Sequence, residues 1–436
     1  MIMRKTLLIF ACVLSTVAAA AQPDSLQQDG DHHFQIDATL WSRGEYRRGA
    51  LPDENGADYA LFMASKALVT VDYDRKGMEV RFAPKYSGVW GAQGAGGVSI
   101  DEAWFGLKHK GFFLRLGRQA LEYDDERIIG DDDWVVAAGR HDVLKTGYEG
   151  GKHKAHLLLA FNQNNEGTNG GTYYVNGAQP YKSMQAIWYH FDPVPQLGAS
   201  LLFMNTAMQD QDEGRKAANI TGQQQLLGAY ADWHPQNFRL QASYYRQTGQ
   251  DEHLLPIKAW MTSIEADWQA SAAWSLNTGY YFMSGDEYYY VPKQGAFGLS
   301  LKKEVRGFNP IFGSHHEFYG AMDFFYVQTY YGGNTPGLQD FHVGANWNPV
   351  PAVSLGATYH FLGTGVKLKD ASRALGHEVE VSASWQIGKD VSLNAGYSFM
   401  KGTETMARLK RTGDRNRLQW GWLMLTVTPE FFSYRF

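Results

Sequence analysis

The chain has 436 residues, a formal net charge of −5 and a single cysteine, Cys12. Because Cys12 lies inside an apolar leader, the rest of the chain offers no thiol, which excludes disulfides and thiolate metal sites. No basic cluster of the kind that binds nucleic acid is present, so we expect no nucleic-acid partner.

The first residues predict a secretory signal peptide at 1–21. Arg4 and Lys5 precede an apolar run, 6–17, and a stretch of alanines follows. A charged region, a short apolar region and a small-residue cleavage site come in this order in signal peptides. The run is too short for a transmembrane helix, which needs about 20 apolar residues. We expect residues 22–436 to form the mature protein.

After the leader, apolar and polar residues alternate in strand-length stretches along nearly the whole chain. One stretch places Val391, Leu393, Ala395, Tyr397 and Phe399 on one face and polar or small residues on the other. A period of two predicts strands with one apolar face. The pattern is typical of an all-β fold, a transmembrane antiparallel up-and-down β-barrel whose apolar face meets lipid and whose polar face lines a lumen.

We predict eighteen strands, an even number as in bacterial single-chain barrels. They cover 34–48, 59–73, 78–90, 99–109, 112–119, 141–149, 153–162, 180–191, 197–205, 222–234, 238–247, 258–268, 273–283, 338–347, 352–363, 376–386, 391–400 and 417–428. Pro429 interrupts the last strand, so we expect that strand to end before the aromatic tail. A large soluble β-sandwich or propeller is the alternative, although a single soluble core rarely exceeds about 300 residues.

Every second connection is short, which is typical of periplasmic turns, and the others are longer, as extracellular loops are. The longest predicted loop is 284–337, and it contains apolar segments such as 308–313. A loop of this length usually has a function. We expect it to fold over or into the mouth of the barrel, or to pack on neighbouring loops.

Strand phase predicts which side chains face the lumen. The inward phase contains the basic residues Arg43, Arg47, Lys66, Arg81, Lys85, Arg115, Lys145 and Lys154, and on later strands the acidic residues Glu265, Asp267, Glu378 and Glu380. In the seventh strand Leu157 faces lipid, so an arginine should be tolerated better at Leu158 than at Leu157. Basic side chains along one side of the lumen would favour the passage of anions. Charges that pair across strands would instead only stabilise the barrel. Both interpretations remain open.

The segment 114–142 carries the most specific motif. It contains Gly-Arg-Gln at 117–119, an acidic-Arg-Ile-Ile-Gly loop at 126–130 and Asp-Trp at 133–134. Here the chain resembles the alginate-export porin family of outer-membrane barrels. The resemblance implies a basic conduit for an acidic polysaccharide, with Arg118, Arg127 and Arg140 at the pore mouth. Alternatively, these arginines anchor the loop through ion pairs with Asp124, Asp125 or Asp133.

The predicted function is that of a porin in the bacterial outer membrane. It would pass anionic solutes, such as acidic sugars or an alginate-like acidic polysaccharide, by passive diffusion. No cofactor, metal or catalytic motif is expected, and the acidic runs at 124–126 and 131–133 lack the regular ligand spacing of a calcium loop. The expected partners are the permeant, outer-membrane lipid and the barrel-assembly machinery. A general porin, an outer-membrane enzyme and an adhesin remain as alternatives.

Overall fold

The structure is a computed structural model of the whole chain. It describes residues 32–49, 56–92, 96–134, 139–168, 174, 179–210, 220–286, 288–291, 296–299, 303–325, 335–410, 412 and 416–436. The predicted signal peptide, 1–21, lies outside the described residues. Among the residues that are described, no helix is long and apolar enough to cross a bilayer.

Strands dominate the described chain. They are β1 (His33–Arg48), β2 (Tyr59–Arg75), β3 (Met78–Val89), β4 (Gly97–His109), β5 (Phe112–Gln119), β6 (His141–Gly150), β7 (His153–Phe161), β8 (Ser183–Val194), β9 (Leu197–Gln209), β10 (Thr221–Trp233), β11 (Phe238–Gly249), β12 (Ala259–Gln269), β13 (Trp274–Met283), β16 (Leu338–Val350), β17 (Val353–Gly363), β18 (Ala374–Gly388), β19 (Val391–Gly402), β20 (Arg417–Val427) and β21 (Glu430–Arg435). A separate hairpin, β14 (Tyr288–Val291) and β15 (Ala296–Leu299), lies in the longest loop, as does the short 3-10 helix η2 (His315–Glu317). The helix α3 (Glu404–Lys410) follows β19.

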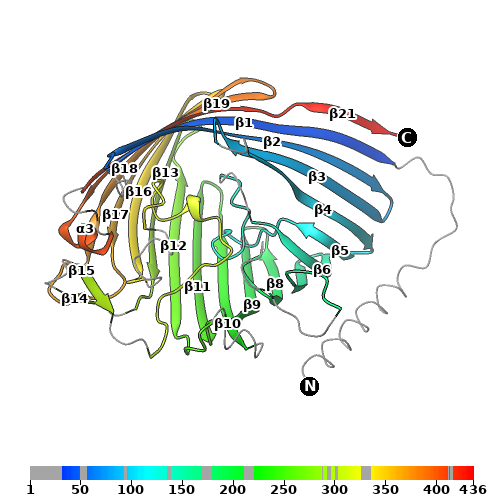
Figure 1. Cartoon of the computed structure of the whole chain (residues 1–436). Helices are drawn as coiled ribbons and strands as arrows, with labels where there is room; N and C mark the ends of the chain where they lie inside the picture. The colour runs from blue at the N-terminus through cyan, green and yellow to red at the C-terminus, as the bar shows by residue number, and fades with distance from the viewer. Residues whose placement is uncertain are drawn as a thin grey trace.

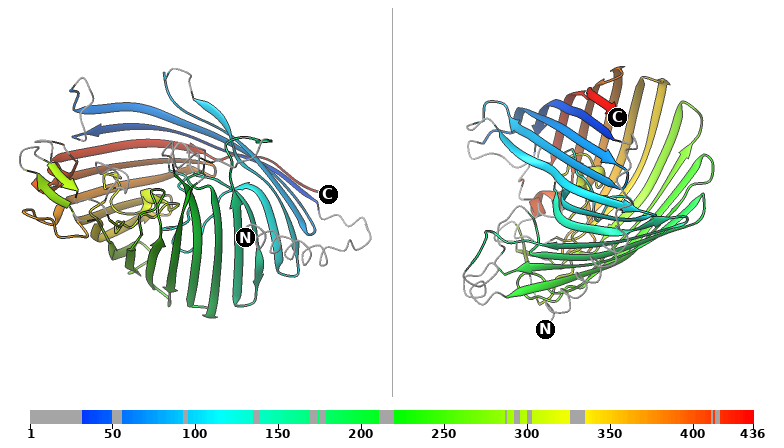
Figure 2. Two further views of the ribbon diagram at one scale, coloured as in Figure 1. Left: turned by 60° about the horizontal axis from the view of Figure 1, so that its bottom comes forward. Right: turned by 90° about the vertical axis from the view of Figure 1, so that its right-hand side faces the viewer.

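Each strand pairs antiparallel with the next, and β1 closes the ring by pairing with β2 on one side and with β20 and β21 on the other. The prediction of eighteen strands in a closed up-and-down barrel is confirmed, with β20 and β21 sharing the last position. Figure 1 shows the red C-terminal strands beside blue β1, and Figure 2 shows the strands following one another around the ring in colour order.

The tail after Pro429 stays in the barrel wall, contrary to the expectation that the last strand would end before it. The break is a register shift opposite Ile36 and Asp37, and the Ala38 N–H donates to the Pro429 carbonyl oxygen at 3.1 Å. Proline removes one ladder donor and is tolerated at such irregularities. Beyond it, His32 and Phe436 exchange two backbone hydrogen bonds of 3.0 Å.

The outer surface of the ring is apolar and the side chains alternate as predicted. Large apolar side chains are exposed on the outward phase of most strands, including Leu201, Phe203, Ile264, Val343, Val381 and Leu423. Exposed tryptophans lie near the ends of strands, and most of them are next to short turns, where Trp274 stacks on Trp347 with ring centroids 5.7 Å apart. An apolar band with aromatic residues at its edge is the surface that a bilayer requires.

The interior, by contrast, is not polar throughout. Inward-facing residues such as Leu158, Leu202, Leu226 and Met261 belong to one buried apolar cluster together with loop residues. Leu158 is 0% exposed. The premise that Leu158 faces an open polar lumen is therefore wrong, and a charge there would enter a packed apolar core rather than water.

Lipid-facing positions provide a test of the strand phase. We expect Leu157→Arg and Leu393→Arg to impair assembly, at a cost of about 2–4 kcal/mol for a position at the bilayer midplane. The matched control is Asn394→Arg, since Asn394 belongs to the inward phase and donates to Ser392. The folded fraction after refolding into lipid, measured by heat-modifiable gel mobility, should separate the variants. Equal folded fractions of Leu393→Arg and Asn394→Arg would contradict the assignment of Leu393 to the lipid-facing side and Asn394 to the inward side of β19.

Candidate functional site

Two loops fold together inside the barrel, and we call residues 120–134 and 303–325 the plug. Ile129 and Phe312 form a parallel bridge, the Gly130 N–H donates to the Phe312 carbonyl oxygen at 2.8 Å, and the Ser314 N–H donates to Glu126 at 2.9 Å. Figure 1 shows the cyan and yellow segments within the ring of strands. Residues 303–325 thus meet both alternatives for the longest loop, because they enter the barrel (Figure 1) and also pack on the loop 120–134.

The plug is tied to the wall by charged side chains of the inward phase. Arg43 donates from Nη1 to the Trp134 carbonyl oxygen at 2.9 Å, and its guanidinium lies 3.9 Å from the Trp134 ring. Lys66 forms an ion pair with Asp133. On the other side, the backbone N–H groups of 321 and 322 donate to Glu380 and Glu378. Several predicted lumen charges are thus anchors for the plug.

Arg127 is the central anchor and is fully buried. Its guanidinium lies between two rings, 4.0 Å from Tyr281 and 3.8 Å from Phe318, and Nε donates to Asp125 at 3.1 Å. Burial alone would lower the pKa of Arg127, but Asp125 and the adjacent tyrosines outweigh it and hold that pKa well above the usual range. Arg127 therefore stays charged and holds the plug from within.

The other two arginines of the motif are also paired. Arg140 forms ion pairs with Asp101 at 2.7 Å and with Asp131 at 2.5 Å, and Lys85 pairs with the same Asp101. Arg118 lies in the outward phase of β5 and makes a two-pronged pair with Asp142 at 2.8 and 2.9 Å. Of the alternative partners expected from the sequence, Asp125 alone pairs with one of these three arginines among the described residues.

A second group of basic residues remains partly open to the lumen, and we call Arg81, Arg115, Lys145 and Lys154 the basic wall. Arg81 pairs with Asp72 at 2.8 Å and with Glu102 at 3.1 Å, and Arg115 pairs with Glu79 at 2.5 Å. The Arg81 and Arg115 side chains are 37% and 31% exposed, whereas Glu102 and Glu79 are 11% and 8% exposed. The carboxylates lie behind the guanidinium groups and leave the cations facing the lumen.

Trp104 joins these two arginines. Its ring centroid lies 5.8 Å from the Arg81 guanidinium and 4.4 Å from that of Arg115. Arg115 donates to Glu79 through Nε, and its two terminal amino groups have no acceptor among the described protein groups. Such groups suit the bidentate binding of a carboxylate. The role of Trp104 was missed from the sequence, because a tryptophan at a strand position reads as part of an aromatic girdle.

Arg115 and Lys145 stand directly opposite each other on β5 and β6. They line a cavity of about 370 Å³ at the short-turn end of the barrel, together with Lys108, Lys110 and Glu149. Like charges directly opposite each other destabilise a sheet. Glu79, which pairs with Arg115 and with Lys108 at 2.5 Å, and Glu149 on the cavity wall offset part of this repulsion. Lys108 and Lys110 were also missed from the sequence, since they belong to a two-residue turn and its flank.

The remaining predicted residue, Arg47, is half-buried. It pairs with Glu45 at 2.9 Å and lies 4.8 Å from the Trp420 ring, while Arg43 pairs with the other oxygen of Glu45 at 2.8 Å. Both belong to the second half of β1, and Arg43 contacts the plug. Most of the predicted residues are therefore plug anchors, members of the partly exposed basic wall or, for Arg118, part of an outward pair. Lys85 and Arg47 instead pair with residues of the barrel wall, Asp101 and Glu45.

Sequence comparison assigns this architecture to a family. The model of a family described as alginate export matches residues 95–363. The chain belongs to the alginate export family. The match includes the plug segments and the strands of the basic wall from β4 onward. The sequence matches none of the curated proteins with which it was compared.

The fold of this alginate export family member is shared with solved outer-membrane channels of Pseudomonas aeruginosa. OprD is 12% identical, with a TM-score of 0.61 over 91% of this chain and 94% of that one. OccK9 (OpdG) is 12% identical, with a TM-score of 0.59 over 91% and 98%. OccK2 (OpdF), solved in complex with glucuronate, is 11% identical, with a TM-score of 0.59 over 92% and 98%. Family and fold place this chain in the bacterial outer membrane as a porin-type barrel.

One histidine of the plug, His315, has a lowered pKa. His315 lies 2.6 Å from the Pro310 carbonyl oxygen through Nε2, and burial lowers the pKa of His315 to about 4. An unfolded histidine has a pKa of about 6.5. The stability that neutral His315 contributes is therefore fully present above pH 6.5 and is lost as the pH falls through 4.

We expect the plug to loosen between pH 6.5 and pH 4, with a loss of up to roughly 3 kcal/mol from this group. Channel conductance and protease access to residues 303–325 should both rise over that range. His315→Gln keeps a donor for Pro310 and cannot titrate, so it should remove this part of the pH dependence. Identical pH profiles for wild type and variant would contradict the assignment.

Proposed function

We propose that this barrel is a passive channel for acidic sugars, namely uronates and short alginate-like oligomers of them. The permeant carboxylates would move along the basic wall on the periplasmic half of β3 to β7, between the wall and the plug. No chemical step is required, because the wall lowers the cost of placing an anion in a narrow polar path. The assignment as a porin-type barrel rests on the fold and the family. The proposal concerns the identity of the permeant.

The observation that carries the proposal is the cavity in which Arg115 faces Lys145. Its volume of about 370 Å³ falls within the range of about 300–1,000 Å³ that is typical of small-molecule sites. Lys145 lies 5.1 Å from the Tyr123 ring and has no ion pair among the described residues. A site with two opposed cations and flanking lysines suits a carboxylate better than a neutral solute.

Two further points support acidic sugars. The Trp104 ring lies beside the Arg81 and Arg115 guanidinium groups, so the groups that would bind the carboxylate of a sugar stand next to an aromatic side chain. OccK2, a solved barrel of the same fold, is known in complex with glucuronate. An acidic sugar is thus compatible with a barrel of this kind.

A general porin is the second candidate, and a specific observation favours it. Most basic residues of the inward phase have a carboxylate partner, as Arg43, Lys66 and Lys85 do, so their charges are largely neutralised. A lumen neutralised in this way would discriminate weakly between ions. An outer-membrane enzyme remains a further alternative.

Single-channel recording tests the proposal. The wild-type barrel in a salt gradient should give a reversal potential of anion preference, and galacturonate or its short oligomers should reduce the current reversibly. Galactose, which lacks the carboxylate, is the control and should reduce the current much less. Equal block by galactose and galacturonate would favour the general porin, and cation preference would overturn the proposal.

A further inference from the structure

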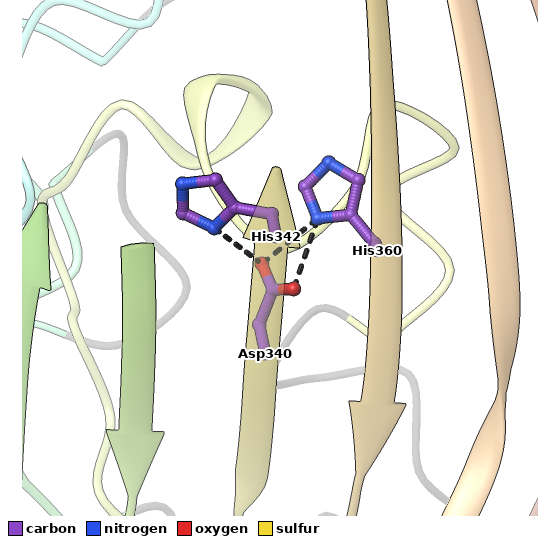
Figure 3. Close-up of side chains that lie close together, drawn as sticks. All are labelled: Asp340, His342 and His360. Atoms are coloured by element: carbon purple, nitrogen blue, oxygen red, sulfur yellow. Dashed lines mark hydrogen bonds and ion pairs between the residues drawn. The ribbon is translucent and has the colours of Figure 1, made fainter. Parts of the chain in front are cut away.

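We propose that Asp340, His342 and His360 form a binding site for one divalent transition-metal ion, with Zn²⁺ as the best match. The three residues lie on the inward face of β16 and β17, beneath the plug. They play no part in the basic wall, and the proposal stands independently of the permeant. Figure 3 shows both imidazole rings turned toward the carboxylate from neighbouring strands.

The position of the three side chains follows from strand geometry. Asp340 and His342 are two residues apart on β16, so they share one face. His360 is the direct cross-strand partner of His342 on β17. All three are buried, and one ligand atom from each lies within 4.8 Å of the others. Ligands about 2.1 Å from one ion are separated by up to about 4.2 Å, so small side-chain rotations would complete the site.

One ring nitrogen in this cluster has no partner. His342 Nδ1 is buried without a hydrogen-bond acceptor or donor, and it lies 3.8 Å from Asp340 Oδ2, which is too far for a hydrogen bond. A buried polar atom without a partner costs about 1–3 kcal/mol. An ion between Asp340 and His342 would bind that nitrogen and remove the cost.

The surroundings hold both rings in place. A Cβ atom at Gly279 would lie 2.5 Å from His342 Cε1, so the ring rests against the bare backbone of β13, and the Tyr281 ring lies 4.7 Å away. His360 places Nδ1 2.9 Å from Asp340 and Nε2 3.4 Å from Glu380. A carboxylate behind the second ring nitrogen is the usual support of a metal-binding histidine.

The ligand set indicates the class of ion. Two imidazoles and one carboxylate suit Zn²⁺ and its first-row neighbours, whereas Ca²⁺ and Mg²⁺ prefer oxygen ligands alone. Three protein ligands leave a fourth position for water or for Glu378, which is opposite His360 on β18. Because Glu378 and Glu380 also accept the plug N–H groups at 321 and 322, the ion would stiffen the wall to which the plug is attached.

Metal titration of the folded, full-length barrel in detergent tests the site. After treatment with a chelator, wild type should bind one Co²⁺ per chain with the visible absorption of nitrogen and oxygen ligation, and Zn²⁺ should displace it. His342→Ala and His360→Ala should abolish binding, and Glu380→Gln should weaken it about 10- to 100-fold. His377→Ala is the matched control, because His377 is hydrogen-bonded to Tyr359 away from the cluster.

The outcomes separate a metal site from a simple ion pair of His360 with Asp340. Absence of Co²⁺ binding to the folded wild type would overturn the proposal whether or not the variants fold. Unchanged stoichiometry in folded His342→Ala and His360→Ala would overturn it as well, since binding would then occur elsewhere. Heat-modifiable gel mobility identifies the folded fraction of each variant.

Discussion

Replacing Arg127 with alanine should open the barrel. Arg127 holds the plug between Tyr281 and Phe318 and compensates the charge of Asp125. Removing one partner of a buried charge pair costs about 3–5 kcal/mol, because the other charge is left without compensation. The plug should therefore leave its packed position in a large fraction of molecules, while the closed ring of strands remains.

Single-channel conductance provides the measurement, and we expect a larger and noisier conductance for Arg127→Ala. The matched control is Arg246→Ala, since Arg246 is exposed on the outward phase of β11. Arg127→Lys should give an intermediate result, because lysine keeps the charge but lacks the planar group that stacks on the rings. A normal conductance in folded Arg127→Ala would show that the plug is held by its apolar contacts alone.

The second large effect concerns selectivity. Changing Arg81, Arg115 and Lys145 together to glutamine removes three cations and leaves Asp72, Glu79 and Glu102 in the lumen. Each unit charge contributes about 1 kcal/mol at 4 Å even in bulk water. We therefore expect the anion-to-cation permeability ratio to fall by about tenfold or more, since 1.4 kcal/mol corresponds to a factor of ten.

Reversal potentials in a salt gradient measure this ratio. The shift should be largest near 0.1 M salt, where the Debye length is about 10 Å, and smaller at 1 M, where it is about 3 Å. The control variant changes Arg246, Lys152 and Lys389 to glutamine, which removes the same charge from the outer face and the turns. A triple variant that inserts normally with unaltered selectivity would refute the role of the basic wall.

Arg43 is not changed in that variant because its side chain is covered by the plug. Its strand phase was correct, but its guanidinium is buried against Trp134 and paired with Glu45. Strand phase tells which side of the wall a residue faces and says nothing of what covers it there. The cover comes from loop residues about 90 positions away along the chain.

The sequence by itself determined the barrel. A period of two, as in Val391 to Phe399, follows from backbone geometry within one strand, and the short turns bring each strand back beside the last. Such features depend on residues close together in the chain, so strand number, phase and the outer apolar face could all be predicted. The family motif at 114–142 pointed to the same class of channel.

Only the tertiary structure decided what fills the lumen. The bridge between Ile129 and Phe312 and the ladder that brings Arg115 opposite Lys145 depend on loop paths and strand register. The register between β16 and β17 likewise places His342 directly opposite His360. A shift of one residue would turn any of these side chains to the other face, and local propensity does not specify where a long loop docks. The plug, the basic cavity and the histidine cluster therefore became visible only in three dimensions.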